Sequence, residues 1–432
     1  MADKGPPNRA RHTDFRRNEK GAIIANNQPN IRAALVRLGV TVSYDSFARR
    51  LLIAGPEGAV QRHLGDDEMA RLYLRVDERF GFRPSREFFW MVVTNEARAN
   101  SFHPVRDYLA GLVWDGKPRL DRWLVTYAGA KDCAYMHAVG SKCLIAAVRR
   151  ARHPGCKFDE MVVFESPQGL EKSTALATLA VKDEWFTDSL PLNADDKQVI
   201  EALSGRWIIE AAELKGLRKG DVEHLKAFLS RQIDRARMSY DRIVTEAPRQ
   251  CVIFGTTNSD AYLRDSTGNR RFWPVEVARF NVEALRQDRD QLWAESAHRE
   301  AKGESIRLDP ALYGAASEEQ ERRVIDDPWV PVIEKGLGAH ATGKILASEA
   351  WDIVDVRPGM RTQDHNERLG AAMRKLGWER KKARFDGKVQ WGYAKGTAQE
   401  RTVRVCIRRG SDGTLDVFET RERDEYPRAY HA

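Results

Sequence analysis

The clearest chemical signal in this sequence is residues 164–174, FESPQGLEKST, which lie between an apolar run and a helical pattern. A phosphate-binding loop has this context. Backbone N–H groups at the helix start face the phosphates, a lysine reaches the outer phosphate oxygens, and the next hydroxyl binds Mg²⁺. Lys172 and Ser173 would fill the last two roles. The residues expected to contact a nucleotide are Gln168, Gly169, Leu170, Glu171, Lys172, Ser173 and Thr174.

The loop departs from the usual pattern at two positions. Ser166 and Glu171 stand where the pattern has glycine, and only Gly169 remains inside the loop. A carboxylate at position 171 would either repel phosphate or point outward without effect. The alternative interpretation is a strand-to-helix loop with an exposed lysine.

Two later segments supply the acid and the polar sensor that a P-loop ATPase needs. The apolar run 207–209 ends in Glu210, which would hold the magnesium shell together with Ser173 or polarise the attacking water, and Glu213 follows three residues on. One of the two is the expected catalytic acid; the alternative is an acid favoured by a helix dipole. Asn258 directly follows the apolar run 251–254 and its threonines, where its amide could contact the γ-phosphate or orient water.

Paired arginines, Arg270 and Arg271, lie on a tight turn after this sensor. An arginine in this place is suited to reach the γ-phosphate of a neighbouring subunit, which implies a ring. The alternative is that both are surface ion-pair residues.

The elements around these residues predict a multidomain α/β protein. From about residue 155, short apolar runs alternate with helical stretches, which predicts a parallel sheet with helices on both faces. Helical patterns dominate before it. After it, two helical patterns and a hairpin with an Asp386-Gly387 turn favour a winged-helix module, followed by a second hairpin around Asp412-Gly413. The predicted divisions are a disordered basic arm (1–28), a mainly helical domain (29–150), the P-loop ATPase domain (151–320) and a winged-helix-like basic module with a terminal hairpin (321–432).

Charge and composition narrow the class of protein. The net charge is +8, and residues 368–395 hold nine lysines and arginines against two acids. This local excess predicts DNA contacts by Lys381, Lys382 and Arg384, unless the segment is only solvated. No apolar run approaches the roughly 20 residues that span a bilayer, and residues 1–20 lack a signal-peptide core, so a cytoplasmic protein without membrane partners is expected. The five cysteines are scattered, so no structural metal is expected.

The chain resembles the virulence-associated protein E family, whose ATPase domain is similar to superfamily-3 helicases and phage primase-helicases. The likeness runs over roughly residues 20–300, and its most specific segments are Thr256–Asn258 and Gly268–Pro274. The resemblance implies an AAA+-like core, use of ATP and Mg²⁺, a hexameric homo-oligomer, and a part in replicating a phage, prophage or other mobile element with other replication proteins. Some members carry an amino-terminal primase-polymerase domain, but this chain begins too late to hold one, and priming is not expected.

In such helicases a loop between the acidic and sensor strands projects into the ring's pore and grips one DNA strand. That interval here contains Arg231, Arg235, Arg237, Tyr240 and Arg242. Arginines neutralise phosphates and tyrosine stacks on bases, which suits sequence-independent binding of single strands. A solvated basic helix end is the alternative.

Three functions therefore compete. The first is an ATP-dependent DNA helicase or translocase, an ATPase coupled to unwinding. The second is a nucleotide-binding DNA factor for replication or regulation with weak hydrolysis, which Glu171 favours. The third is a nucleotide-gated interaction protein without a DNA role.

Overall fold

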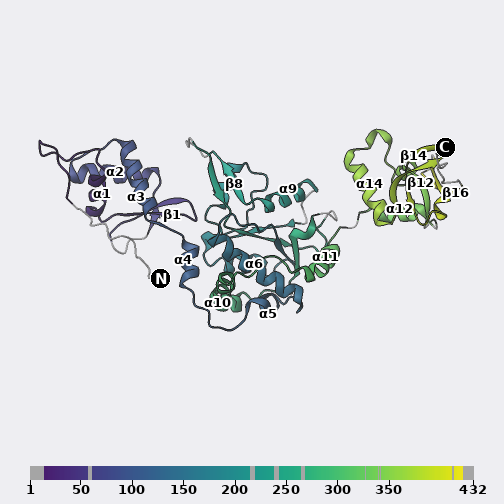
Figure 1. Ribbon diagram of the computed structural model, residues 1–432, viewed down its shortest axis with the longest axis horizontal. Coiled ribbons are helices and arrows are strands. Elements are labelled where there is room, and N and C mark those ends of the chain that lie inside the picture. The colour runs from purple at the N-terminus through teal and green to yellow at the C-terminus, as the bar shows by residue number, and fades with distance from the viewer. Residues whose placement is uncertain are drawn as a thin grey trace, which may run out of the picture. The chain divides into compact units, whose positions relative to one another are not determined.

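The computed structural model describes residues 14–56, 61–214, 219–237, 243–263, 268–325, 327–338, 340, 342–410 and 413–421. It divides into two units, with the boundary between Val324 and Ile325 (Figure 1). The multidomain α/β architecture predicted from the sequence is confirmed. Among the described residues, no helix has the length and apolar character needed to cross a membrane.

The first part of unit 1 is a small sheet covered by helices. Its strand order is β3-β2-β1-β4, with β1 and β2 antiparallel and β4 parallel to β1. The prediction of a mainly helical region omitted this sheet because β1, β3 and β4 contain no run of apolar residues. The elements are α1 (Gln28–Arg37), β1 (Thr41–Asp45), β2 (Arg50–Ala54), β3 (Arg62–His63), α2 (Asp66–Phe80), α3 (Arg86–Ala99) and β4 (Ser101–Phe102).

Residues 14–27, predicted to belong to a disordered arm, are held against this sheet domain. The buried amide of Asn30 donates to the carbonyls of Arg16 and Ile24, at 2.9 and 2.8 Å, and its oxygen accepts from the Arg16 N–H at 2.7 Å. Phe15 packs edge-on against Phe80. These contacts order a polar segment that its composition alone predicts to be disordered. Residues 1–13 lie outside the described part of the chain.

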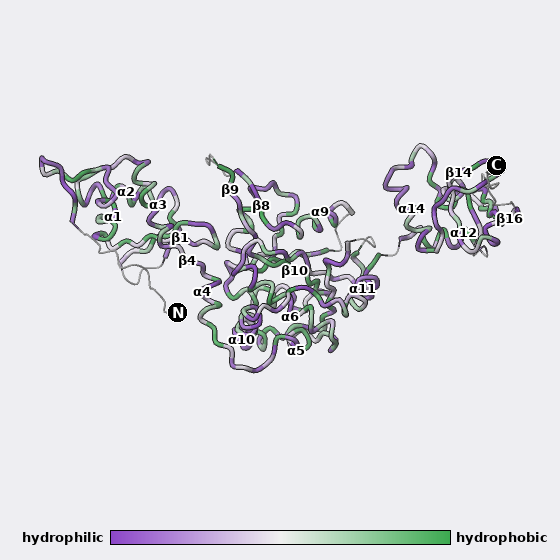
Figure 2. Tube along the Cα trace, viewed as in Figure 1, coloured by the Kyte–Doolittle hydropathy of each residue, from purple (hydrophilic) through white to green (hydrophobic). Residues whose placement is uncertain are grey.

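The centre of unit 1 is a five-stranded sheet in the order β11-β5-β10-β7-β6. All neighbouring strands are parallel, as predicted. The central strand β10 is buried along its whole length, and its hydropathy can be followed in Figure 2. The strands are β5 (Met161–Glu165), β6 (Phe186–Thr187), β7 (Ile208–Ala211), β10 (Val252–Thr257) and β11 (Phe272–Glu276).

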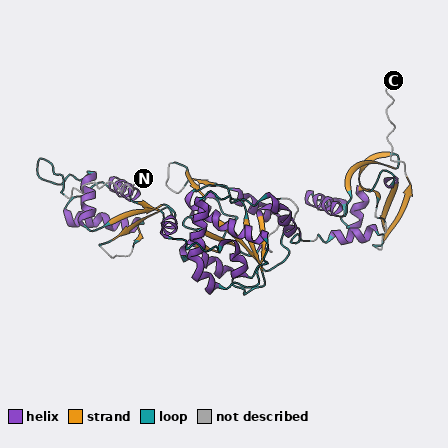
Figure 3. Cartoon of the chain, turned by 60° about the horizontal axis from the view of Figure 1, so that its bottom comes forward, coloured by secondary structure: helices purple, strands orange, loops and turns teal. Residues whose placement is uncertain are grey.

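Helices cover both faces of this sheet, as Figure 3 shows and the sequence predicted. Alternate residues of β5 enter different hydrophobic clusters, Val162 and Phe164 in one, Met161 and Val163 in the other. Helices α4 (Pro104–Gly111), α5 (Trp123–Ala128), α6 (Ala134–Arg152), α7 (Lys172–Leu179), α10 (Val282–Ala301) and α11 (Tyr313–Glu321) contribute to the first cluster, and α8 (Asp196–Leu203) and α9 (Lys219–Ser230) to the second.

Unit 2 has its own core and a sheet in the order β13-β14-β12-β15-β16. Its turn residues Asp386 and Gly387 have φ of 48° and 77°, so the predicted hairpin turn is confirmed. The first of the two helical patterns predicted for this region covers residues 342–351, and it is wrong at its start. Gly343 has φ of 130°, which no helix accommodates, and 343–346 form a strand. The elements are α12 (Trp329–Leu337), β12 (Gly343–Leu346), α13 (Ala347–Ile353), α14 (Gln363–Lys375), β13 (Glu379–Phe385), β14 (Lys388–Lys395), β15 (Val403–Arg409) and β16 (Leu415–Arg421).

The second predicted hairpin is also present, as the antiparallel pair β15 and β16. Of its expected turn, Gly413 is described, with φ of 84°. Asp412 lies outside the described residues.

Candidate functional site

The predicted phosphate loop connects the end of β5 to the start of α7. Because the neighbouring strands are parallel, their carboxyl ends meet at one edge of the sheet, where open α/β sheets bind ligands. Gly169 and Glu171 have φ of 81° and 66°, and Ser173 and Thr174 are exposed in the first turn of α7. The loop therefore presents backbone N–H groups and hydroxyls at the start of an eight-residue helix, the arrangement that suits an anion.

Lys172 is buried and its Nζ lies inside the loop. It donates to the carbonyl and hydroxyl oxygens of Ser166, at 2.9 and 2.8 Å, and to the Pro167 carbonyl at 3.1 Å. Burial lowers the pKa of Lys172, while the nearby Glu210 carboxylate opposes that shift. The ammonium is thus held by neutral acceptors, which phosphate oxygens could replace with a stronger, charge-assisted interaction.

Glu210 lies at the carboxyl end of β7 and is 1% exposed. Its Oε1 accepts from the Ser173 hydroxyl at 2.8 Å and from the Thr256 hydroxyl at 2.5 Å. Its Oε2 is buried, and none of the described residues donates a hydrogen bond to it. A buried carboxylate oxygen without a donor, next to a hydroxyl, is the donor set that Mg²⁺ and its waters prefer, so Ser173 and Glu210 fit the predicted metal site.

Asn258 and Glu213 lie at the same edge of the sheet. The position of β10 between β5 and β7 places Asn258 between the loop and the acidic strand, and its Oδ1 accepts from Lys172 Nζ at 3.0 Å. Glu213 is exposed just beyond β7, with φ of 57°. A hollow of about 250 Å³, lined in part by Asp188 and Ala212, opens beside this end of β7.

Sequence reasoning missed two contributors to this edge. The sequence places Thr256 only within the sensor segment, yet its hydroxyl donates to the Glu210 carboxylate. Glu165, the last residue of β5, accepts from the Tyr262 hydroxyl at 2.6 Å and from Arg323 Nε at 2.8 Å. An acid that ends a buried strand was a visible signal for Glu165, but its partner lies 158 residues away in the chain.

The paired arginines lie at the opposite edge of the sheet. They occupy the turn Asn269–Arg271 before β11, and Phe272 pairs with Met161 at the start of β5. Arg271 is engaged, since its Nε donates to the Ser230 hydroxyl at 3.1 Å and lies 3.6 Å from an Asp159 oxygen. Arg270 is exposed, and no carboxylate in the described ranges pairs with it. A β-strand rises about 3.3 Å per residue, so the length of β5 separates Arg270 from its own phosphate loop.

The interval between β7 and β10 forms an antiparallel hairpin of β8 (Ile233–Ala236) and β9 (Thr245–Pro248). Arg235 is exposed and pairs with Glu246 at 3.0 Å, and Arg237 is also exposed. Tyr240 and Arg242, predicted to bind DNA, lie outside the described residues. At the hairpin base, buried Asp234 and Arg249 form a two-bond ion pair at 2.7 and 2.8 Å.

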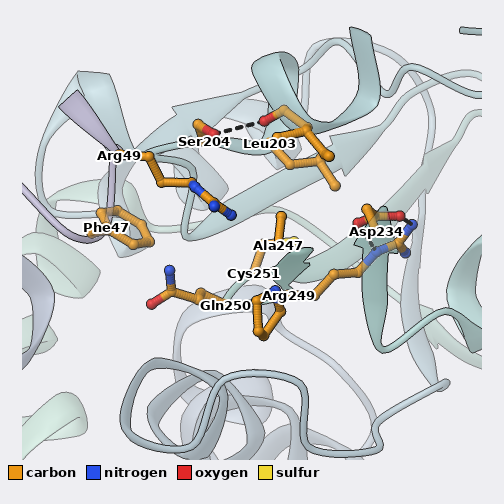
Figure 4. Close-up of a pocket in the computed structure, with 11 residues that line it drawn as sticks. Phe47, Arg49, Leu203, Ser204, Asp234, Ala247, Arg249, Gln250 and Cys251 are labelled. Carbon is orange, nitrogen blue, oxygen red and sulfur yellow. Dashed lines mark hydrogen bonds and ion pairs between the residues drawn. The ribbon is translucent and has the colours of Figure 1, made fainter. Parts of the chain in front are cut away.

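A small pocket of about 30 Å³ lies beside this hairpin base (Figure 4). Phe47 and Arg49, from the turn between β1 and β2, lie on one side, and the Arg49 guanidinium donates to the Glu246 carbonyl at 3.1 Å. The pocket is too small for a nucleotide and lies at the amino end of β10, away from the phosphate loop. Its significance is that the amino-terminal sheet domain contacts the hairpin.

In unit 2, the predicted DNA contacts lie on β13. Lys382 is exposed, whereas Lys381 and Arg384 are half-buried. Side chains alternate along a strand, so Lys382 and Arg384 share one face and Lys381 lies on the other. The three predicted residues therefore do not form a single contact surface.

The profile of the virulence-associated protein E-like domain matches residues 109–325. No curated protein matched the chain. Three structures of the NrS-1 C-terminal region align with it: two with 12% and 13% identity, each at a TM-score of 0.47, and one with 14% identity at 0.44. The structure with 12% identity covers 85% of this chain and 99% of its own length. The other two each cover 86% of this chain and 100% of their own length.

Proposed function

This chain belongs to the virulence-associated protein E-like family, and we propose that it is a Mg²⁺-dependent P-loop ATPase that moves along DNA during replication of a mobile element. The observation that carries the proposal is the 2.8 Å contact between Ser173 and Glu210, beside the ammonium of Lys172. Hydroxyl, carboxylate and lysine converge at the carboxyl edge of a parallel sheet, as nucleotide hydrolysis requires. The strand order and the family together favour an AAA+-like core.

In this mechanism each side chain has a distinct task. Ser173 and Glu210 would hold Mg²⁺, which would supply positive charge to offset that of the phosphates. Lys172 binds the phosphate oxygens. Asn258, whose Oδ1 lies 3.0 Å from Lys172 Nζ, orients the attacking water. We assign the role of accepting the water's proton to the exposed Glu213, because Glu210 would be engaged with Mg²⁺.

We assign the trans-acting arginine to Arg270. It is exposed and lies at the edge of the sheet opposite its own loop, while Arg271 is committed to Ser230. An exposed arginine that cannot serve its own site can serve that of a neighbour, and this is the basis for proposing a homo-oligomeric ring, hexameric by family resemblance.

The β8–β9 hairpin is the proposed contact for single-stranded DNA in the ring. Its exposed cations suit the phosphate backbone. The Asp234–Arg249 ion pair at the base of the hairpin and the Arg49 contact beside it would transmit movement of the ATPase core to the bound DNA strand. In unit 2, helix, strand, two helices and a hairpin follow in the order of a winged helix, and we propose that β13 and β14 form its basic wing.

ATP hydrolysis by the purified chain, with and without single-stranded DNA, tests the proposal. Lys172→Ala and Glu210→Gln should abolish DNA-stimulated turnover, and Lys302→Ala, which removes an exposed lysine at the end of α10, should not. Arg270→Ala should also be inactive alone. Mixing it with Lys172→Ala subunits should restore part of the activity, because an intact loop then meets an intact arginine. No restoration on mixing, or turnover that survives Lys172→Ala, would contradict the assignment.

One observation favours a second candidate, a nucleotide-binding DNA factor with weak turnover. Glu171 places a carboxylate and a positive φ in the loop at a position where glycine is usual. This factor would bind nucleotide and DNA in the same assays but hydrolyse ATP slowly until Glu171 is replaced by glycine.

A further inference from the structure

One face of the β13–β14 hairpin exposes a large aromatic side chain among cations. Lys382 pairs with Trp391 across the two strands, and Arg384 pairs with Val389. Directly paired residues point to the same side of a sheet, and so does Arg380, two residues before Lys382. These five residues, Arg380, Lys382, Arg384, Val389 and Trp391, are called the tryptophan face below.

Trp391 is 49% exposed, and its neighbour Val389 is 44% exposed. Other tryptophans of unit 2, such as Trp351 and Trp378, are buried in its core. An indole ring that leaves half its area in water gives up hydrophobic stabilisation that burial would provide, so its exposure needs a reason outside the folding of this unit.

The environment of the ring is cationic. The guanidinium carbon of Arg380 lies 5.1 Å from the centroid of the Trp391 ring, and Lys382 Nζ lies 5.3 Å from it. No carboxylate among the described residues forms an ion pair with Arg380, Lys382 or Arg384. Asp386, in the turn of the hairpin, is paired with Arg404. An aromatic ring bordered by unneutralised cations is complementary to a ligand that is both planar and anionic.

We propose that the tryptophan face binds unpaired nucleotides, with one base stacked on Trp391 and the flanking phosphates on Arg380, Lys382 and Arg384. Stacking on an aromatic ring accepts any base, because every base has a π-face, and cations along the backbone add affinity without sequence preference. A stacked duplex offers no free base faces except at its ends. The site therefore selects single strands, which deepens the proposed action on DNA and rests on it, but requires no ATP.

Equilibrium binding of a fluorescent single-stranded oligonucleotide, without nucleotide, tests this site. Trp391→Ala should weaken binding by about 5-fold or more, the effect of losing one stacked base. Trp391→Phe, which keeps an aromatic ring, should recover most of the affinity. Tyr313→Ala, which removes a 57% exposed aromatic residue from α11, is the matched control and should bind as the parent does.

An oligonucleotide with abasic sites separates stacking from a structural effect. It keeps the phosphates but lacks the bases, so the parent and Trp391→Ala should bind it equally. An equal loss on the normal and abasic strands would mean that Trp391 only supports the hairpin, and would overturn the proposal. Unchanged affinity of Trp391→Ala for the normal strand would overturn it as well. Absence of any DNA binding by the parent would reject the proposed DNA function itself.

Discussion

Glu171 offers the sharpest test of the phosphate loop, because two properties of this residue can be removed separately. Its φ and ψ of 66° and 24° lie in the left-handed region, which costs an L-residue roughly 1–2 kcal/mol and glycine nothing. Glu171→Gly relieves this strain. It also raises the conformational entropy of the unfolded chain, which offsets about 0.4–1 kcal/mol of that gain in stability. Glu171→Gln keeps the strain and removes only the charge.

Both variants lose the interaction of a carboxylate with the start of α7, which is worth about 0.3–1 kcal/mol. The difference in unfolding free energy between the two variants therefore reports the backbone effect alone. We expect Glu171→Gly to be more stable than Glu171→Gln by about 1 kcal/mol in denaturant unfolding without nucleotide. In calorimetric titrations with Mg²⁺-ATP, both should bind more tightly than the parent, because both remove a like charge beside the phosphates. Equal stability of the two variants would refute the strain argument, and unchanged ATP affinity in both would refute the charge argument.

Two further predictions concern the frame around the site. Asp234→Asn leaves the guanidinium of Arg249 buried without its counter-charge. We expect this to lower the free energy of unfolding by about 3–5 kcal/mol and to reduce DNA binding by the hairpin. A loss below about 1 kcal/mol would mean that water reaches the ion pair. His103 caps α4 with Nδ1 and contacts Gln250 through Nε2, and burial lowers its pKa from 6.5. Its contribution to stability is therefore complete above about pH 6.5 and is lost as the pH falls through its folded pKa, because the unfolded chain binds the extra proton. His103→Asn, which retains a capping side chain, should flatten the dependence of the melting temperature on pH between pH 5 and 7. An unchanged slope would mean that other titratable groups cause this dependence.

Much of the fold was predictable because its signals are local. Apolar runs of strand length alternating with helical periodicity predicted the parallel sheet and the helices on both faces. The Asp386-Gly387 turn predicted a hairpin for the same reason, since positive φ at both positions is a property of the residues themselves. The amino-terminal sheet was missed because three of its strands, β1, β3 and β4, contain no run of apolar residues like those of the central sheet.

The candidate site was predictable in outline for a topological reason. In a parallel sheet every strand ends at the same edge. Lys172, Glu210 and Asn258 each lie at or beyond the end of a different strand, so they had to approach one another. The contacts between them were not predictable. That Thr256 shares Glu210 with Ser173, and that Arg323 joins Glu165, depends on strand order, which no local pattern encodes.

The sequence by itself determined which residues could do chemistry and on which kind of element each would lie. Only the tertiary structure decided which of them act together. Strand register placed Arg270 at the edge of the sheet opposite its own loop, and the pairing of β13 with β14 placed Lys382 opposite the exposed Trp391. These outcomes follow from pairing between distant segments, whose free energy depends on packing across the whole sheet and not on the residues adjacent in the chain.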